Sequence, residues 1–424
     1  MNLYPHQVDT LKATEGRNRV AYYLDMGLGK TYVGSEKMYE LNRPCNLVIC
    51  QKSKIKDWLE HFDEHYNVFL YDLTTRKGFD SFFSQADLFS PRVGIINYEL
   101  AWRRKDLLKL HGFTLMLDES SLIQNKTAKQ TKFILKLDAA NVILLSGTPT
   151  SGKYENLWTQ AHLLGWNISE TMYNRQYINW KLIDVPGGMK VKVVDKANPY
   201  KNVERLKAKF REHGAVFMKT EDVMTLPQQN FIEVKVSKSK EYTRFMKDGI
   251  VTVNGVELVG DTTFTARLYA RQLCGQYSQG KLEAFSDLLQ STNDRIIVFY
   301  NFTAEMEALK AVCEAQNRPV AVVNGEHKEV STFEENPSCV LLGQYQAASM
   351  GLNLQKANKI IYFSLPERSD LFEQSKKRIH RIGQTQPCFY YVMMCAGSIE
   401  GDIYEALKQK RDYTDELFAE RNKE

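Results

Sequence analysis

The stretch R-V-A-Y-Y-L-D-M-G-L-G-K-T, from Arg19 to Thr31, determines the fold that we expect for this chain. Its first part, Arg19–Leu24, is an apolar run typical of a buried strand, and a segment of helical length follows the glycine-rich turn. Gly27 and Gly29 allow the backbone to curl so that successive amides point at one place, and the amino end of the next helix adds its dipole. A strand, a glycine-rich turn and a helix in this order predict a phosphate-binding loop.

The two residues that end the turn supply the chemistry that a bound nucleotide needs. Lys30 is placed to reach the β- and γ-phosphates, and the Thr31 hydroxyl is placed to hold Mg²⁺. Leu24 stands where the general P-loop pattern has a glycine, so a glycine-rich turn in a Rossmann-like domain is the alternative interpretation. The residues predicted to contact the nucleotide in this segment are Met26, Gly27, Leu28, Gly29, Lys30 and Thr31.

A pair of adjacent acids forms the second signal, in L-M-L-D-E-S, from Leu115 to Ser120. Asp118, at the carboxyl end of an apolar strand, can bind Mg²⁺ through water, and Glu119 can orient and deprotonate the attacking water. Such a pair alone is a weak signal, but a P-loop followed by an apolar strand that ends in D-E is much more specific. Together the two segments indicate ATP hydrolysis with Mg²⁺.

Two series of short apolar runs, separated by stretches long enough for helices, predict the architecture. Near-continuous apolar strands that alternate with helical segments indicate parallel sheets covered on both faces, and two series indicate two α/β domains in tandem. The first series is Arg19–Leu24, Asn46–Cys50, Val93–Asn97, Leu115–Leu117 and Val142–Leu145. The second is Arg295–Tyr300, Val320–Val323, Cys339–Leu342, Lys359–Phe363 and Phe389–Met394.

Between the two series, at about residues 160–290, the regular alternation of apolar strands and helices is lost. Helical stretches and a hairpin are expected there instead. The hairpin is predicted at Ile250–Val259, where Asn254 and Gly255 form a strong type I′ turn signal. Asp184–Tyr200 is predicted to be an exposed loop or a short hairpin. The carboxyl end, Ser398–Glu424, has the pattern of a charged amphipathic helix.

The composition is that of an ordinary globular protein, with 43% hydrophobic and 25% charged residues among 424. The longest apolar run, Cys388–Ala396, is too short to span a bilayer, and the amino end lacks the pattern of a signal peptide. The seven cysteines are scattered without a C-x-x-C pair, which fits a reducing cytosol and argues against a disulfide framework. A net charge of +5 permits a nucleic-acid partner without arguing for one.

Further short motifs lie on both sides of the P-loop and the acid pair. In chain order they are L-Y-P-H-Q (Leu3–Gln7), L-V-I-C-Q-K-S-K-I-K-D-W (Leu47–Trp58), I-I-N-Y-E-L (Ile95–Leu100), L-S-G-T-P (Leu145–Pro149), F-M-K-T-E-D-V (Phe217–Val223), Q-Y-Q-A-A-S-M-G-L-N-L-Q (Gln344–Gln355), Q-S-K-K-R-I-H-R-I-G-Q (Gln374–Gln384) and S-I-E-G-D-I-Y (Ser398–Tyr404). With these motifs the chain resembles the Swi/Snf-type ATPases of helicase superfamily two, particularly the compact forms found in bacteriophages. The resemblance runs from about Leu3 to about Phe418.

This resemblance implies an α/β protein with two tandem RecA-like lobes, each built on a parallel sheet. The first lobe would span residues 1–222, with a helical protrusion at about 160–215. The second would span 223–424, with a hairpin and helical insertion at about 240–280 and a brace helix at 398–424.

The resemblance also assigns roles to single residues. Gln7 would read the adenine base, and Gly351 would contact the nucleotide from the second lobe. Ser146, Thr148 and Gln374 would couple hydrolysis to lobe movement. The candidates for nucleic-acid contact are Lys52, Ser53, Tyr98, Gln124, Asn125, Gln344 and Gln346.

Two departures from the family pattern stand in the second lobe. Ala348 and Ser349 occupy the places of two glycines, and Lys377 occupies the place of another. The first change makes a loop on the nucleic-acid side bulkier, and the second adds a charge beside the arginines. The catalytic residues are all present, which argues against an inactive relative.

Arg378 and Arg381 are the candidates for the positive charge that phosphoryl transfer needs at the γ-phosphate. They are three positions apart, so on a helix they would share one face. They come from the second α/β series, whereas Lys30, Asp118 and Glu119 come from the first. We therefore expect ATP to lie between the lobes, so that lobe closure completes the site and product release reopens it. The alternative for R-I-H-R is a solvated basic helix face.

His61 and His65 are four apart on an expected helix and could in principle bind a metal. The sequence completes no cysteine or histidine cluster around them, so an ordinary surface pair is the favoured interpretation.

The function expected from the sequence is a nucleic-acid-stimulated ATPase that moves along duplex DNA and remodels DNA or protein–DNA complexes. A strand-separating DNA or RNA helicase is the first alternative, and a clamp that binds ATP without hydrolysing it is the second. ATP and Mg²⁺ are the expected cofactors. The expected partner is duplex or branched DNA, RNA is not excluded, and a protein partner could select the target. We expect a monomer that does not bind a membrane. The expected location is the cytoplasm of a bacterial or phage-infected cell.

Overall fold

The computed structural model describes residues 3–84, 91–150, 153–185, 189–195, 197–223, 225–327, 330–348 and 354–418. The contacts between residues divide the chain into two units. Unit 1 comprises Met1–Met224 with Tyr413–Glu424, and unit 2 comprises Thr225–Asp412.

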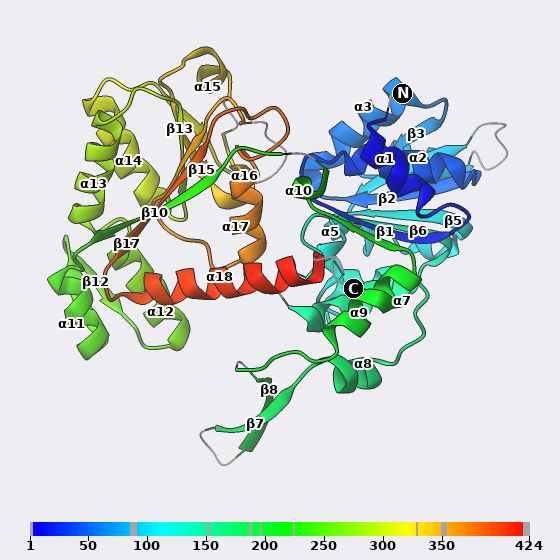
Figure 1. Cartoon of the computed structure of the whole chain (residues 1–424), viewed down its shortest axis with the longest axis horizontal. Helices are drawn as coiled ribbons and strands as arrows, with labels where there is room; N and C mark the ends of the chain where they lie inside the picture. The colour runs from blue at the N-terminus through cyan, green and yellow to red at the C-terminus, as the bar shows by residue number, and fades with distance from the viewer. Residues whose placement is uncertain are drawn as a thin grey trace. The chain divides into compact units, whose positions relative to one another are not determined.

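Unit 1 is built on a parallel sheet of seven strands within the described residues, in the order β3-β4-β2-β5-β6-β1-β9 (Figure 1). The strands are β1 (Arg19–Leu24), β2 (Cys45–Cys50), β3 (Phe69–Asp72), β4 (Arg92–Asn97), β5 (His111–Asp118), β6 (Asp138–Ser146) and β9 (Ala215–Met218). An antiparallel hairpin, β7 (Trp180–Val185) and β8 (Met189–Val194), extends away from this sheet. The hairpin begins four residues before the loop or short hairpin predicted from Asp184.

The helices of unit 1 cover this sheet or lie in the segment around the hairpin. They are α1 (Pro5–Lys12), α2 (Lys30–Glu40), α3 (Ile55–His65), α4 (Arg76–Ser84), α5 (Tyr98–Ala101), α6 (Lys129–Ile134), α7 (Trp158–Leu163), α8 (Glu170–Tyr177), α9 (Val203–Glu212) and α10 (Thr220–Val223). Short 3₁₀ turns lie at η1 (Lys52–Lys54), η2 (Lys105–Lys109), η3 (Ser120–Ile123) and η4 (Tyr154–Leu157).

Unit 2 is built on a second parallel sheet, in the order β10-β17-β16-β13-β15-β14. The strands are β10 (Gln229–Val236), β13 (Ile296–Tyr300), β14 (Val320–Val323), β15 (Val340–Gln344), β16 (Lys359–Tyr362) and β17 (Cys388–Cys395). The helices are α11 (Lys240–Asp248), α12 (Thr263–Cys274), α13 (Gln279–Gln290), α14 (Thr303–Ala315), α15 (Ser331–Glu335), α16 (Tyr345–Ala348) and α17 (Ser369–Lys376), and α18 (Ile399–Phe418) follows β17.

Both faces of the second sheet are covered, as the continuous apolar strands predict. Ile297 and Phe299 of β13 pack into one core cluster, which includes side chains of α16 and α17. Ile296 and Val298 of the same strand pack into another, which includes side chains of α13 and α14. Successive residues of a strand point to opposite faces, so an all-apolar strand is the sequence of a sheet with helices on both sides. The predicted fold class is confirmed.

The hairpin predicted at Ile250–Val259 is also confirmed, as β11 (Ile250–Val253) paired with β12 (Val256–Val259). Asn254 has a φ of 49° and Gly255 a φ of 78°. Positive φ at both central residues is what a type I′ turn requires.

Within the described part of the chain, no helix has both the length and the apolar character that a membrane crossing requires.

Candidate functional site

The glycine-rich turn between β1 and α2 has the backbone conformation that its sequence predicts. Gly27 has a φ of 90° and Gly29 a φ of 78°, in the left-handed region that favours glycine. Gly29 is also the residue that precedes the first turn of α2, which begins at Lys30. The structure therefore places Lys30 and Thr31 at the amino end of a helix, where an anion is stabilised.

Gln7 lies directly against this turn. Its Nε2 donates to the Leu28 carbonyl at 3.2 Å, and its Oε1 accepts from the Tyr4 amide at 2.9 Å. A Cβ atom on Gly29 would lie 2.0 Å from the Gln7 Nε2, so a larger residue at this position would force the Gln7 side chain to move. Gln7 thus connects α1 to the phosphate-binding turn, and its contact with adenine stays a prediction.

Lys30 lies close to the two acids at the carboxyl end of β5, Asp118 and Glu119. Its Nζ donates to the carbonyls of Leu24 and Asp25, at 2.9 and 3.1 Å. Its charge acts on Asp118 and Glu119, where it opposes the rise in pKa that burial causes. The structure therefore brings the P-loop lysine and the acid pair together in one site within unit 1.

Asp118 ends β5 and is fixed by an indole. Trp58 of α3 donates its Nε1–H to the Asp118 Oδ2 at 2.9 Å. Burial raises the pKa of the Asp118 carboxyl, and the Trp58 hydrogen bond opposes this rise. Mg²⁺ prefers oxygen ligands, and the Asp118 carboxylate and the Thr31 hydroxyl both supply them.

Glu119 has a left-handed backbone, with a φ of 60°, which is uncommon for a residue other than glycine. The hydroxyls of Ser121 and Ser146 both donate to its Oε1, at 2.7 and 2.6 Å. Burial raises the pKa of the Glu119 carboxyl, and the Ser146 hydrogen bond is the largest effect that opposes this rise. Two hydroxyl donors hold this carboxylate in one orientation, which is a requirement for a general base.

Ser146 joins the acid pair to the L-S-G-T-P segment. It ends β6, and besides donating to Glu119 its hydroxyl oxygen accepts from the Thr148 amide at 3.1 Å. The Thr148 side chain is buried. The structure thus shows a direct bond between the two motifs, while coupling to lobe movement stays a prediction.

Gln160 of α7 is a site residue that the sequence did not reveal. Its Oε1 accepts hydrogen bonds from Tyr23 of β1 and from Ser120, each at 2.9 Å, and its Nε2 donates to the Pro149 carbonyl at 2.8 Å. The side chain is fully buried. One amide therefore connects the strand before the P-loop, the residue after the acid pair and the L-S-G-T-P segment. A lone glutamine on a short helix carries no local signal of this role.

Lys52 and Ser53 are exposed on η1, which follows β2, and their contact with nucleic acid stays a prediction. Asn125 and Gln124 line an open groove in unit 1, together with Lys126, Trp158 and Trp180. Asn125 is exposed and caps its own turn, because its Oδ1 accepts from the amide and the hydroxyl of Thr127.

Tyr98 was predicted to contact nucleic acid, and its side chain does not lie where such a contact is made. The ring is 1% exposed and packs in the core of unit 1. Its hydroxyl donates to the Asp118 carbonyl at 2.9 Å. Tyr98 is the first residue of the helix α5, and its side chain points into the core. Its hydroxyl therefore supports the backbone of the acid pair and does not face the surface.

In unit 2 the candidate residues lie at the carboxyl ends of strands and on the helices that follow. Gln344 ends β15 and is partly buried, Gln346 is exposed on α16, and Gln374 is buried on α17. Gly351 lies outside the described residues.

Arg378 and Arg381 do not lie on a helix, so the predicted shared helix face is wrong. The helix α17 ends at Lys376, and both arginines lie in the turns that follow. His380 between them has its Nε2 2.9 Å from the Pro227 carbonyl, and Ile379 is fully buried. These tertiary contacts turn the chain where the spacing alone predicted a continuous helix. Burial lowers the pKa of the Arg381 guanidinium.

His61 is part of a hydrogen-bonded cluster in unit 1. Its Nε2 lies 2.8 Å from the Ser35 Oγ, and burial lowers its pKa to about 4. The described residues bring no third side chain of a metal-binding type to His61 and His65. His61 is buried and packs edge-on against the rings of Tyr32 and Trp58, so the prediction that it lies at the surface is wrong.

Comparison with known proteins gives two family matches. Residues 23–274 match the SNF2-related domain, and residues 280–383 match the helicase conserved C-terminal domain.

Similar proteins come from distant organisms. The SWI/SNF-related matrix-associated actin-dependent regulator of chromatin subfamily A-like protein 1 of Drosophila melanogaster is 24% identical over 448 residues, covering 99% of this chain and 56% of that protein. YwqA of Bacillus subtilis, named for ATP-dependent helicase or translocase activity, is 23% identical, covering 94% of this chain and 46% of that protein. The chain spans about half the length of these curated relatives.

Among solved structures, the SWI2/SNF2 ATPase core of Sulfolobus solfataricus in complex with dsDNA has 21% sequence identity and a TM-score of 0.45, covering 98% of this chain and 93% of that one. The SNF2-related match alone covers more than half of the chain, and the helicase match follows it directly in the sequence. The chain belongs to the SNF2-related family of helicase superfamily two.

Proposed function

We propose that this protein is a nucleic-acid-stimulated ATPase that couples ATP hydrolysis to movement along duplex DNA, and so remodels DNA or protein–DNA complexes. The observation that carries the proposal is the site in unit 1, where Lys30, Asp118 and Glu119 lie together and Ser146 bonds to Glu119. The names of the relatives, which include chromatin regulators and a helicase or translocase, support the same class of activity.

Each residue of this site has a task in the proposed reaction. Lys30 and the amino end of α2 would hold the β- and γ-phosphates, and Thr31 and Asp118 would hold Mg²⁺, which neutralises phosphate charge when bound. Glu119 would orient the attacking water and take its proton. Ser146 and Ser121 keep the Glu119 carboxylate oriented through their hydrogen bonds.

Gln160 would act as a positioning residue, because it holds three segments of this site at once. We expect Gln160→Met, which keeps the size but removes the hydrogen bonds, to lower kcat about tenfold, equal to roughly 1.4 kcal/mol in the barrier. The KM for ATP should change little, because the residue does not touch the phosphate turn. Steady-state ATPase kinetics on the full chain measure both constants.

Gln130→Met is the matched control for this prediction. Gln130 also donates to a backbone carbonyl, that of Leu122, but among the described residues it forms no hydrogen bond to the P-loop strand or to L-S-G-T-P. A similar fall in kcat in both variants, or a rise in KM alone for Gln160→Met, would show that Gln160 is only a packing residue.

The residues at the tip of the hairpin β11–β12 favour movement on duplex DNA without strand separation. The tip, Asn254 and Gly255, carries no aromatic ring that could stack on a separated base. Lys52, exposed on η1, is suited to contact phosphate, which carries no sequence information. Binding is therefore expected to be non-specific and to weaken strongly as salt rises.

The experiment that tests this proposal compares displacement of a third strand from a triplex with unwinding of a forked duplex, at matched salt. We expect ATP-dependent triplex displacement, no unwinding, and neither activity in Lys30→Ala. The ATPase rate with single-stranded DNA, duplex DNA, branched DNA and RNA identifies the partner. Unwinding of the fork without triplex displacement would support a strand-separating helicase, and DNA binding without hydrolysis would support a clamp.

A further inference from the structure

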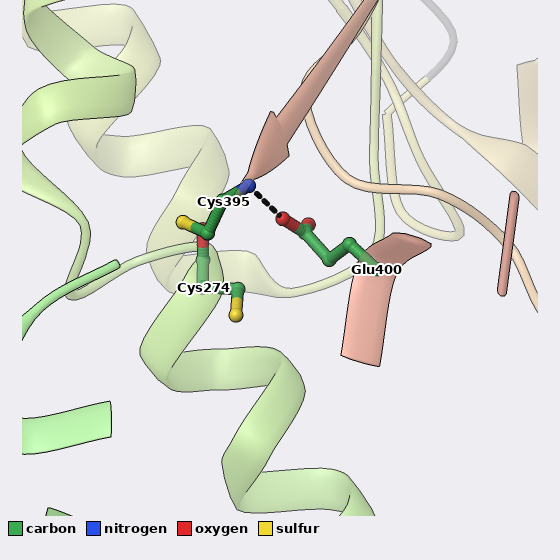
Figure 2. A group of neighbouring side chains, drawn as sticks. All are labelled: Cys274, Cys395 and Glu400. Carbon is green, nitrogen blue, oxygen red and sulfur yellow. Dashed lines mark hydrogen bonds between the residues drawn. The ribbon is translucent and has the colours of Figure 1, made fainter. Parts of the chain in front are cut away.

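A buried group of reactive side chains lies in unit 2, apart from every residue assigned to ATP or nucleic acid. Cys274 is the last residue of α12, Cys395 is the last residue of β17, and Glu400 lies in the first turn of α18 (Figure 2). The two sulfurs and a carboxylate oxygen all lie within 4.8 Å of one another. Both cysteines are almost fully buried. Two thiols and a carboxylate at this separation suit either a metal ion or thiol oxidation.

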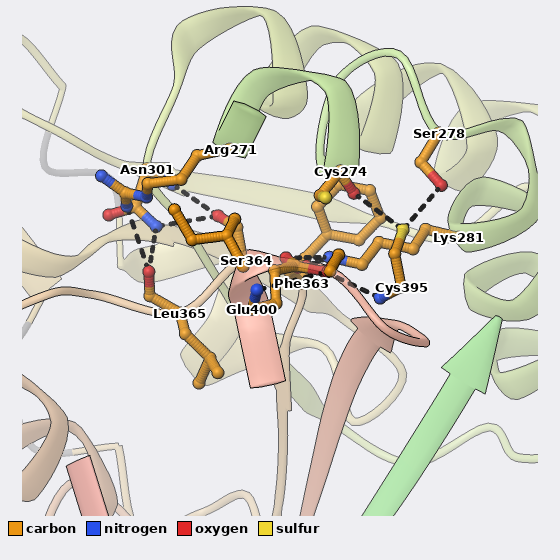
Figure 3. Close-up of polar contacts among 12 residues, drawn as sticks. Arg271, Cys274, Ser278, Lys281, Asn301, Phe363, Ser364, Leu365, Cys395 and Glu400 are labelled. Carbon is orange, nitrogen blue, oxygen red and sulfur yellow. Dashed lines mark hydrogen bonds and ion pairs between the residues drawn. The ribbon is translucent and has the colours of Figure 1, made fainter. Parts of the chain in front are cut away.

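The contacts of Glu400 argue against a metal ion. Its Oε1 is paired with the ammonium of Lys281 at 2.5 Å, and its Oε2 accepts from the Cys395 amide at 2.8 Å (Figure 3). Lys281 is fully buried and also donates to the Phe363 carbonyl at 2.7 Å. Burial alone would lower the pKa of Lys281, but Glu400, Cys395 and Glu305 together outweigh this effect and raise it. A stable cation therefore already neutralises the carboxylate.

The two sulfurs differ in their surroundings. The Cys395 Sγ lies 3.5 Å from the Ser278 hydroxyl oxygen and 3.7 Å from the Cys274 carbonyl oxygen. Cys274 and the positive charge of Lys281 lower the pKa of Cys395, against the effect of burial. The contact with Cys395 and burial raise the pKa of Cys274. The Ser278 hydroxyl, which contacts this sulfur, and the ammonium of Lys281, whose charge acts on it, are thus placed to stabilise a thiolate on Cys395.

We propose that Cys274 and Cys395 form an oxidisable thiol pair, which a peroxide converts into a disulfide that ties α12 to the end of β17. Cys395 acts first, because the thiolate is the nucleophilic form of cysteine. Cys274 is the resolving thiol, because its sulfur is the neighbour of Cys395 in a buried site with two cysteines. The function of this pair is independent of the ATP site.

The reaction balances with hydrogen peroxide as the oxidant. The Cys395 thiolate attacks one peroxide oxygen, the O–O bond breaks, and the leaving hydroxide takes a proton to become water. The Cys274 sulfur then attacks the sulfur of the resulting sulfenic acid, the S–O bond breaks, and the leaving hydroxide takes the Cys274 proton. Two thiols are oxidised to one disulfide, and one peroxide is reduced to two waters.

The disulfide would raise the thermal stability of unit 2. Cys274 and Cys395 are 121 positions apart in the chain, so their bond closes a long loop of the unfolded state. Closing a loop of this length should raise the melting temperature of unit 2 by roughly 10 °C.

The test uses the full chain, reduced, freed of reductant and then treated with hydrogen peroxide at neutral pH. We expect mass spectrometry to find a peptide that joins Cys274 to Cys395, dithiothreitol to reverse it, and the melting temperature to rise on oxidation. Cys274→Ser should leave a sulfenic acid on Cys395 that dimedone traps. Cys395→Ser should leave Cys274 reduced.

Cys313→Ser is the matched control, because Cys313 is equally buried in unit 2 but burial raises its pKa to about 12. This variant should keep the joined peptide. Two results would overturn the proposal. One is oxidation of other cysteines while Cys274 and Cys395 can still be alkylated. The other is one bound zinc ion per chain that is lost in both Cys274→Ser and Cys395→Ser, which would make the group a metal centre.

Discussion

Glu119→Gln is expected to bind ATP as the unchanged protein does and to hydrolyse it roughly a thousandfold more slowly. The amide has nearly the same shape as the carboxylate, and its oxygen can still accept from Ser121 and Ser146. It cannot take a proton from water, so the loss should fall on the chemical step. Nucleotide binding titrations and single-turnover hydrolysis measure the two effects separately.

Glu99→Gln is a suitable control for this experiment. Glu99 is an exposed carboxylate in the same unit, held by the Asn97 amide at 2.6 Å, and we assign it no task in hydrolysis. Wild-type turnover in Glu119→Gln would show that another group is the base. Loss of nucleotide binding in Glu119→Gln would place this residue in binding and not in proton transfer.

Arg381→Lys is expected to lower kcat by on the order of a thousandfold with a modest change in ATP affinity, and Arg378→Lys should act in the same way. We propose that these arginines stabilise charge on the γ-phosphate in the transition state. Lysine keeps the positive charge but loses the planar fork that fits phosphate oxygens. Steady-state kinetics and a nucleotide titration on the full chain separate the two constants.

Arg368→Lys controls for a general effect of losing a guanidinium near α17, because Arg368 precedes that helix and forms an ion pair with Asp370. Thermal unfolding of each variant detects damage to unit 2, in which Arg378 is buried. If Arg381→Lys and Arg378→Lys are folded and turn over normally, the arginines have no part in hydrolysis.

The parts of the structure that the sequence predicts well depend on local patterns. The β1 strand and its turn to α2 follow from an apolar run and two glycines, and the hairpin β11–β12 follows from Asn254 and Gly255. The edge strands β3, β9 and β10 are absent from the predicted series. β10 mixes polar and apolar residues and has no fully buried side chain, because an edge strand is covered less completely than a central one. β9 is apolar throughout but only four residues long, so this reason does not apply to it.

The parts that the sequence does not predict depend on contacts between distant segments. Gln160 gains its importance only because Tyr23, Ser120 and Pro149 meet around it. The family resemblance made Tyr98 a candidate for nucleic-acid contact, yet its side chain lies in the core and its hydroxyl donates to the Asp118 carbonyl. No periodicity or short motif carries such information.

The hydrogen bond from Ser146 to Glu119 has a consequence for how a hydrolysis event is transmitted. A hydroxyl bonds about twice as strongly to a charged carboxylate as to a neutral group. If Glu119 takes the proton of the attacking water, this 2.6 Å bond weakens at that moment. The same hydroxyl oxygen accepts from the Thr148 amide. Protonation of Glu119 would therefore change the hydrogen bonding of the L-S-G-T-P backbone before any product leaves.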